Sequence, residues 1–257
     1  ADTRRLLARA AREADDLAGA VDTLLELRAL EGWEEPDEWE LVVVATAAGR
    51  WDVVRDTAAR LGMEVEPGDG PIDERWHLVV VRYPDGSDAA AVRTGPATAR
   101  VIDVSLPSEP QRHGDVVVIE PTPLEPFDPE QDDEDIPVFA HVCDLERGGF
   151  AGYPVEGDFP GDDAVGALRQ ALDEAGAALW VYSAGDDEVE SGDGTEAGGF
   201  YAMVAVVPGA EAAAHDALAT AAATASWNGR LAWPELARAA DDEAAAEGHE
   251  RYLEGLR

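Results

Sequence analysis

An apolar segment at residues 200–207 constrains the fold more than any other feature of this sequence. It holds no charged residue, follows Gly198-Gly199 and ends at Pro208-Gly209. A short apolar run between such breakers is typical of a buried strand. Apolar residues recur at helical spacing on both sides of it, at 164–175 and 211–226. We therefore predict a central strand here, in a compact domain of mixed α+β class.

The elements around this strand follow a known order. Between residues 137 and 233 the patterns predict a strand at 138–142, a helix, two strands, a helix and a short last strand. The stretch 150–163 is rich in Gly and Pro, and we expect an irregular loop there. β-α-β-β-α-β is the ferredoxin-like order. The segment therefore predicts an α/β sandwich.

A similar order of strands and helices is predicted earlier in the chain. Residues 39–83 predict a strand at 41–45, a short helix from Trp51 and two further strands, which is β-α-β-β without a second helix. We therefore predict an α+β fold of two ferredoxin-like α/β sandwich units in tandem, with a long N-terminal helix and a C-terminal helix. Two more strands are expected at 101–106 and 116–120.

Proline and acidic residues mark the boundary between the two units. Five prolines fall within 121–137, and 128–135 is almost wholly acidic, which favours an extended, solvated segment. A long surface loop within one domain is the alternative. The predicted organisation is an N-terminal amphipathic helix at 1–36, a first α+β unit at 37–120, a linker at 121–136, a second unit at 137–233 and a C-terminal helix at 234–257.

The first thirty residues predict one long amphipathic helix at 3–30. Apolar residues step by three and four positions along one seam. The seam consists of Leu7, Ala10, Ala14, Leu17, Val21 and Leu24. It can pack on the protein's own sheet, or it can pair with another chain. We name Leu7, Leu17, Val21 and Leu24 as candidate partner-binding residues.

The charge balance is extreme. The chain carries 55 acidic residues against 19 basic ones, all of them arginine, for a net charge of −36. Such a chain repels itself at low salt, and molar salt shortens the Debye length to ~3 Å. The pattern predicts a protein of a salt-accumulating halophile; an acidic protein of a high-GC bacterium is the alternative. Because phosphate binding needs basic groups, we expect no nucleic-acid partner.

Two further observations predict a cytoplasmic protein. No apolar run approaches the ~20 residues that cross a bilayer, so we expect no membrane segment, and no secretory signal is supported. A single cysteine, Cys143, fits a reducing compartment.

The absence of lysine excludes several chemistries. P-loop nucleotide binding, Schiff-base chemistry and a pyridoxal-phosphate imine all need a lysine. No GxSxG nucleophile elbow and no His-based zinc motif occurs either. We therefore expect no cofactor.

Two groups of residues remain as candidates for chemistry. His141 and Cys143 share one face of a predicted strand, where they could form a thiolate nucleophile or bind a soft metal; an inert cysteine beside an ordinary histidine is the alternative. Acidic residues between 186 and 196 could bind a hard cation, although the EF-hand spacing is absent. The candidate metal ligands there are Asp187, Glu190, Asp193 and Glu196.

One stretch resembles a known family. The run Trp227-Asn228-Gly229-Arg230-Leu231-Ala232-Trp233 is similar to the aromatic-Asp-Gly-Trp turn of the small acidic α+β regulators that inhibit ribonuclease E. The family's Tyr-Asp-Gly-Trp itself does not occur, and no site residue is carried over. The resemblance spans 137–233 and implies a regulator of that class.

The sequence does not decide whether the protein is an enzyme, and it favours a non-catalytic role. We predict a regulatory or protein-binding module of a halophilic cytoplasm, which binds a protein partner or self-associates through its N-terminal helix. The alternatives are an enzyme with its site in the cleft between the two units, or a regulator resembling the ribonuclease E inhibitors.

Overall fold

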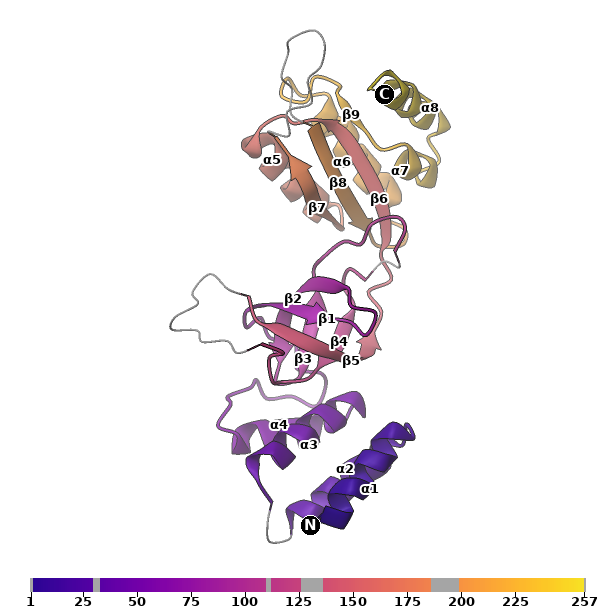
Figure 1. Ribbon diagram of the computed structural model, residues 1–257. Helices are drawn as coiled ribbons and strands as arrows, with labels where there is room; N and C mark the ends of the chain where they lie inside the picture. Colours follow the sequence, from indigo (N-terminus) through magenta and orange to yellow (C-terminus); the bar gives the residue numbers. More distant parts are fainter. Residues whose placement is uncertain (1, 30–32, 110–111, 126–135, 186–198, 257) are drawn as a thin grey trace. The chain divides into compact units, whose positions relative to one another are not determined.

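A computed structural model describes residues 2–29, 33–109, 112–125, 136–185 and 199–256 (Figure 1). The described residues form a mixed α+β protein with eight helices and two sheets. The chain divides into two compact units. Unit 1 comprises Ala1–Ile102 and Gly114–Arg147, and unit 2 comprises Asp103–His113 and Gly148–Arg257. No helix of the described residues combines the length and the apolar composition that a bilayer crossing requires.

Unit 1 begins with two helices where the sequence predicts one. α1 spans Asp2–Glu13 and α2 spans Leu17–Arg28. Asp15 adopts a positive φ of 61°, and the Asp16 carboxylate caps α2 by accepting a hydrogen bond from the Gly19 amide at 3.0 Å. The prediction of one helix over 3–30 is therefore wrong, because the two aspartates end the first helix and start the second.

The predicted strand at 41–45 is also wrong. These residues lie in α3, Glu35–Ala47, which α4, Trp51–Arg60, follows as the sequence predicts. Every residue from Leu41 to Thr46 is buried. One side of α3 packs on the other helices, while Val42 and Val43 pack against Val118 of the sheet in unit 1. A helix that is buried on every side has no polar face, so its sequence lacks the helical period. Such an apolar run is therefore easily predicted as a strand.

The sheet of unit 1 is a closed five-stranded barrel. Its strands are β1 Leu78–Arg82, β2 Asp88–Gly95, β3 Thr98–Val101, β4 Val116–Ile119 and β5 Val138–Glu146. Neighbouring strands are antiparallel, except that β5 closes the barrel by pairing parallel to β1. Alanines of β2 and β3 fill the interior opposite valines, Tyr83 and Phe139. Such pairing of small and large residues fills a narrow barrel.

The barrel corrects three expectations. The first unit is not a ferredoxin-like sandwich, because its strands close on one another. The strand at 138–142 begins β5 and pairs with β1 and β4, so it belongs to unit 1 although the sequence places it in the second unit. The strand expected at 101–106 ends at Val101 as β3, and the following residues 103–113 belong to unit 2.

A buried arginine lies between aromatic rings in the barrel unit. Arg93 of β2 is 9% exposed, and its guanidinium lies 5.5 Å from the Trp76 ring centroid and 5.2 Å from that of Phe139. It donates hydrogen bonds to the carbonyl oxygens of Gly95 and Pro96. Burial lowers the pKa of Arg93 to about 10. These contacts hold the turn between β2 and β3.

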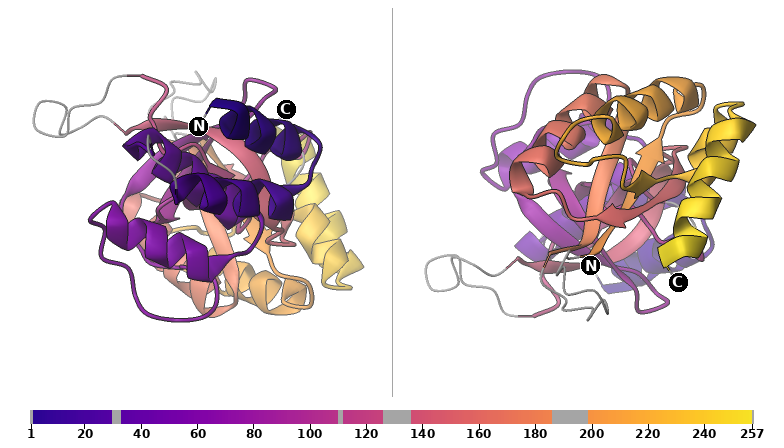
Figure 2. Two further views of the ribbon diagram at one scale, coloured as in Figure 1. Left: turned by 90° about the horizontal axis from the view of Figure 1, so that it is seen from below. Right: turned by 90° about the horizontal axis from the view of Figure 1, so that it is seen from above.

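Unit 2 has the element order β-α-β-β-α-β. The elements are β6 Ala151–Asp158, α5 Asp162–Glu174, β7 Ala177–Ala184, β8 Gly199–Val206, α6 Glu211–Ala222 and β9 Leu231–Ala232. The antiparallel sheet has the strand order β7-β8-β6-β9. Helices α5 and α6 lie side by side on one face of this sheet (Figure 2, right view).

The first strand of unit 2 lies where the sequence predicts an irregular loop. β6 contains Gly152, Pro154 and Gly157, but it pairs with β8 along its whole length. Gly157 is needed where β9 crosses, because a Cβ there would come 2.3 Å from the Arg230 carbonyl oxygen. The glycines and the proline of β6 therefore led to the prediction of a loop, although pairing with β8 stabilises a strand.

The central strand is confirmed as β8. Ala202, Val204 and Val206 face the helices, and Met203 and Ala205 face the opposite side. On that opposite side they pack against Val104, from the segment between β3 and β4. Val104 thus covers part of the sheet face opposite to α5 and α6.

Two helices end the chain, α7 Pro234–Ala239 and α8 Glu243–Leu256. Asp241, with a φ of 62°, separates them where the sequence predicts one helix. The indole nitrogen of Trp233 donates to His215 Nδ1 at 2.9 Å, and the His249 ring centroid lies 4.1 Å from that of Trp233. His215 Nε2 lies 3.5 Å from an Asp242 carboxylate oxygen. A histidine on α6 and one on α8 therefore enclose Trp233.

We expect the packing of α8 against Trp233 to weaken at acidic pH. Burial lowers the pKa of His249, and the nearby His215 lowers it further, against an opposing effect of Asp242. In the unfolded chain, His249 binds a proton at about pH 6.5. In the folded chain it does so only at a lower pH, because its pKa is lowered. We therefore expect the free energy of unfolding to fall as the pH drops below about 6.5.

Thermal melts between about pH 5 and pH 8 measure this effect. His249→Phe keeps a ring against Trp233 and should flatten the acidic limb of the curve. Tyr252→Phe on the same helix is the matched control, because the pKa of Tyr252 is raised to about 12 by burial and the group does not titrate in this range. An unchanged acidic limb in His249→Phe would contradict the assignment.

Candidate functional site

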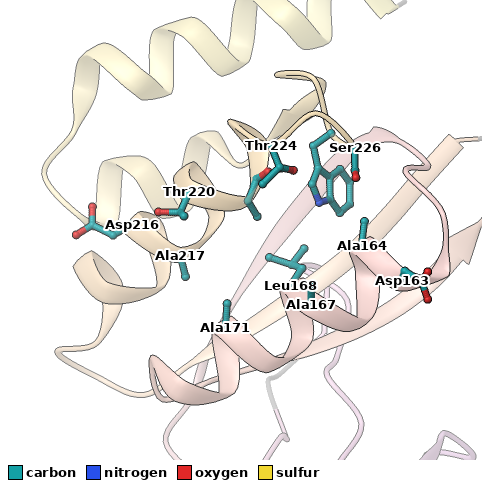
Figure 3. Close-up of a pocket in the computed structure, with 12 residues that line it drawn as sticks. Asp163, Ala164, Ala167, Leu168, Ala171, Asp216, Ala217, Thr220, Thr224 and Ser226 are labelled. Carbon is teal, nitrogen blue, oxygen red and sulfur yellow. The ribbon is translucent and has the colours of Figure 1, made fainter.

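An open groove lies between α5 and α6 in unit 2 (Figure 3). Its volume is about 530 Å³. α5 supplies Asp163, Ala164, Ala167, Leu168 and Ala171. α6 and the loop after it supply Asp216, Ala217, Thr220, Ala221, Thr224, Ser226 and Trp227. The lining is mostly apolar, although the chain as a whole is strongly acidic.

The spacing of small residues explains the groove. On α5, Val165, Leu168 and Leu172 are buried toward the sheet, while Ala164, Ala167 and Ala171 form a second stripe beside them. Steps of three and four place a stripe on one helix face. The same steps occur on α6 from Ala217 to Ala221 and continue to Thr224 in the loop after it. Because each alanine fills only one methyl of space, two such stripes leave a channel between the helices.

The floor of the groove is buried and apolar. Leu168 is 1% exposed and Trp227 is 3% exposed. The Trp227 ring packs edge-on against Phe200 of β8, with the ring centroids 5.1 Å apart. Asp163 and Asp216 are exposed on the two walls, and none of the lining residues is basic. The groove can therefore accept an apolar surface that carries positive charge at its margin.

His141 and Cys143 have different neighbours in the structure. The His141 ring stacks on Tyr83 at 4.6 Å, and its Nε2 lies 2.9 Å from an Asp144 carboxylate oxygen. Cys143 instead packs with Val142 and Leu145 in the cluster that contains α3 residues. Burial raises the pKa of the Cys143 thiol, and Asp144 raises it further. A raised pKa disfavours the thiolate form that a nucleophilic cysteine needs.

His141 also lines a second pocket, in unit 1. This pocket of about 600 Å³ is polar, with Arg9, Arg12, Glu13, Glu40 and Glu120 among its lining residues. Arg12 donates to Glu40 at 3.0 Å and to Glu120 at 2.8 Å. These two ion pairs tie α1 to α3 and to the end of β4. Among the described residues, no group of three or more His, Cys, Asp or Glu is placed to hold a metal ion.

The predicted partner-binding residues divide between core and surface. Val21 and Leu24 are buried in the helical core of unit 1, and Leu17 packs against its edge. Leu7 is 57% exposed. The candidate metal ligands Asp187, Glu190, Asp193 and Glu196 lie outside the described residues. Sequence reasoning missed the groove, whose only local signal is a second alanine stripe on each helix.

Comparisons with known proteins give no family. No family model matches the chain. No curated protein matches it either. A crystal structure described as that of a hypothetical protein from Neisseria gonorrhoeae is similar at 11% sequence identity, over 62% of this chain and 93% of the other, with a TM-score of 0.27.

Proposed function

We propose that this chain is a non-catalytic protein-binding module, and that the α5–α6 groove is its docking site. The observation that carries the proposal is the groove itself, an apolar channel between two acidic helices. An amphipathic helix binds such a channel by placing residues at i, i+3, i+4 and i+7 into it. The partner that fits is a helix with an apolar stripe flanked by arginine or lysine.

A small-molecule ligand is less well supported. Ligand pockets of this size, about 300–1,000 Å³, combine an apolar lining with convergent polar groups that orient the ligand. Here the polar lining residues, Thr220, Thr224, Ser226 and the two aspartates, are spread along the channel. A channel with a polar margin suits an elongated partner better than a compact one.

We also propose a cellular environment and a fold class that go with this function. We infer a halophilic cytoplasm, because the acidic excess needs screening at high salt and the lone Cys143 suits a reducing compartment. We also infer that unit 2 is of the ferredoxin-like class, since its β-α-β-β-α-β elements make the strand order β7-β8-β6-β9. Regulation through a bound partner follows from a non-catalytic site of this kind.

A designed helical peptide with leucines at i, i+3 and i+7 and arginines beside them tests the groove. In about molar KCl, the peptide should shift the alanine methyl NMR signals of Ala164, Ala167 and Ala217 in a saturable manner. Ala167→Trp fills the channel at an exposed position and should abolish the shifts. Ala219→Trp, an exposed α6 residue that does not line the groove, is the matched control and should bind normally. Shifts spread elsewhere, or equal binding by Ala167→Trp, would overturn the proposal.

A further inference from the structure

The outer face of α1 carries an apolar stripe. Leu6 is 66% exposed and Leu7 is 57% exposed, which are the highest values among the large apolar side chains described. Ala10, one turn further along, is exposed as well. The inner face of α1 is different, because Ala8 and Ala11 pack into the helical core of unit 1. The first half of the predicted seam is thus turned outward.

The charge of α1 is opposite to that of the rest of the chain. It contains four of the 19 arginines within twelve residues, against two acids. Three of these arginines are engaged within the chain, since Arg4 pairs with Glu26 of α2, and Arg5 and Arg12 pair with acids of α3. Arg9 is exposed near the leucine stripe. The helices that wall the groove carry the complementary sign. α5 contains four acids and one arginine, and α6 contains two acids and no arginine.

These two surfaces have matching chemistry. The groove accepts an apolar stripe with a basic margin, and among the described helices α1 presents exposed leucines with Arg9 near them. We infer that α1 of a second copy of this chain occupies the α5–α6 groove, with Leu6 and Leu7 in the channel and Arg9 toward its acidic margin. This inference rests on the proposed function, because it names the partner of the same groove.

Pairing of α1 with α1 of another copy is the competing arrangement. It would bring the exposed Arg9 of each copy to the same interface, and like charges across an interface disfavour it. Docking in the groove would place Arg9 beside Asp163 or Asp216 instead. In molar salt the charges are screened, so burial of the leucines supplies the attraction and the charges select the partner surface.

A mixing experiment separates these arrangements. The full chain is studied by light scattering in about molar KCl, where we expect concentration-dependent association. Leu7→Asp removes the stripe but leaves the groove, and Ala167→Trp fills the groove but leaves the stripe. Each variant alone should be monomeric. An equal mixture should associate again, because the intact α1 of one variant meets the intact groove of the other.

The possible results decide the inference. If Ala167→Trp associates as the wild type does, α1 does not use the groove and the inference is overturned. If the wild type is monomeric while the designed peptide binds the groove, the inference fails and the protein-binding function stands. If neither binds, both fail. Ala217→Glu on the opposite wall serves as a second groove variant if Ala167→Trp does not fold, and circular dichroism checks the fold of each.

Discussion

In dilute buffer we expect this protein to lose its folded structure, and in about molar KCl we expect it to regain it. The net charge is −36, so the compact state brings many carboxylates together. At about 0.1 M salt the Debye length is ~10 Å, which lets neighbouring carboxylates repel one another, and at 1 M it is ~3 Å. Because a domain is stable by only ~5–15 kcal/mol, unscreened repulsion of this extent can remove the whole margin.

The structure shows which carboxylates repel. Among the described acids, three are buried, and each has an arginine partner. Asp37 pairs with Arg5, Glu38 with Arg28 and Arg60, and Asp115 with Arg147. The remaining described acids are at least partly exposed to solvent. Their repulsion, and not the buried pairs, therefore sets the salt dependence.

Circular dichroism during a KCl titration, with thermal melts at each step, measures the effect. The midpoint of unfolding should rise steeply through the sub-molar range. Sucrose in place of KCl is the control, because it favours compact states without screening charge. A protein that melts at the same temperature in dilute buffer and in molar KCl would refute the expectation, and with it the inference of a halophilic setting.

Replacing Glu38 should destabilise unit 1 by roughly 1–3 kcal/mol, because it removes a buried acceptor of charge-assisted hydrogen bonds, although Arg28 keeps its ion pair with Asp56 at 2.7 Å. Glu38 is 7% exposed and lies on α3. It accepts from Arg28 of α2 and, at 2.9 Å, from Arg60 of α4, and Arg28 also donates to Thr57. One carboxylate thus joins three helices. Burial raises the pKa of Glu38, but the hydrogen bonds from Arg28 and Arg60 outweigh it, so the pKa is lowered overall.

Urea unfolding of Glu38→Gln in about molar KCl measures this loss, since salt screens a buried pair much less than an exposed one. Asp52→Asn, which removes the exposed partner of Arg50, is the matched control and should change stability far less. The combined change Glu38→Leu with Arg28→Met should recover most of the loss by packing apolar groups in the same space. A Glu38→Gln variant as stable as Asp52→Asn would show that the triad contributes nothing.

The lowered pKa of Glu38 gives the same triad a pH signature. A carboxylate whose pKa is lower in the folded state stabilises the fold above the pKa of the unfolded chain, and this contribution is lost as the pH falls through the folded value. The acid limb of Glu38→Gln should therefore be shallower than that of the wild type below about pH 4.3.

Local sequence patterns were reliable where one element has one buried face. α4, α5, α6 and β8 lie close to where their apolar spacing places them. These patterns were unreliable where an element is buried on two sides, and where pairing between strands overrides the local conformational preference of the residues. The run at 41–45 is helical because it is buried between helices and barrel, and β6 is a strand in spite of Pro154 because β8 pairs with it throughout.

Of the surfaces proposed to be functional, one was indicated by the sequence and the other was not. From the sequence, Leu7 stands out as part of an apolar seam, and the structure leaves it on the surface. The α5–α6 groove could not be read in advance, because an alanine stripe is ordinary on any helix. It becomes a channel only when a second stripe, on α6, is packed beside it.

The sequence by itself determined the charge of this protein, its missing lysine chemistry and the α+β character of its apolar runs, since composition and short-range periodicity do not depend on distant contacts. The tertiary structure decided that the first sheet closes into a barrel, that β5 belongs to it, and that α1 turns its leucines outward. Each of these depends on which segments meet in space, and pairing between residues far apart in the chain leaves no local trace.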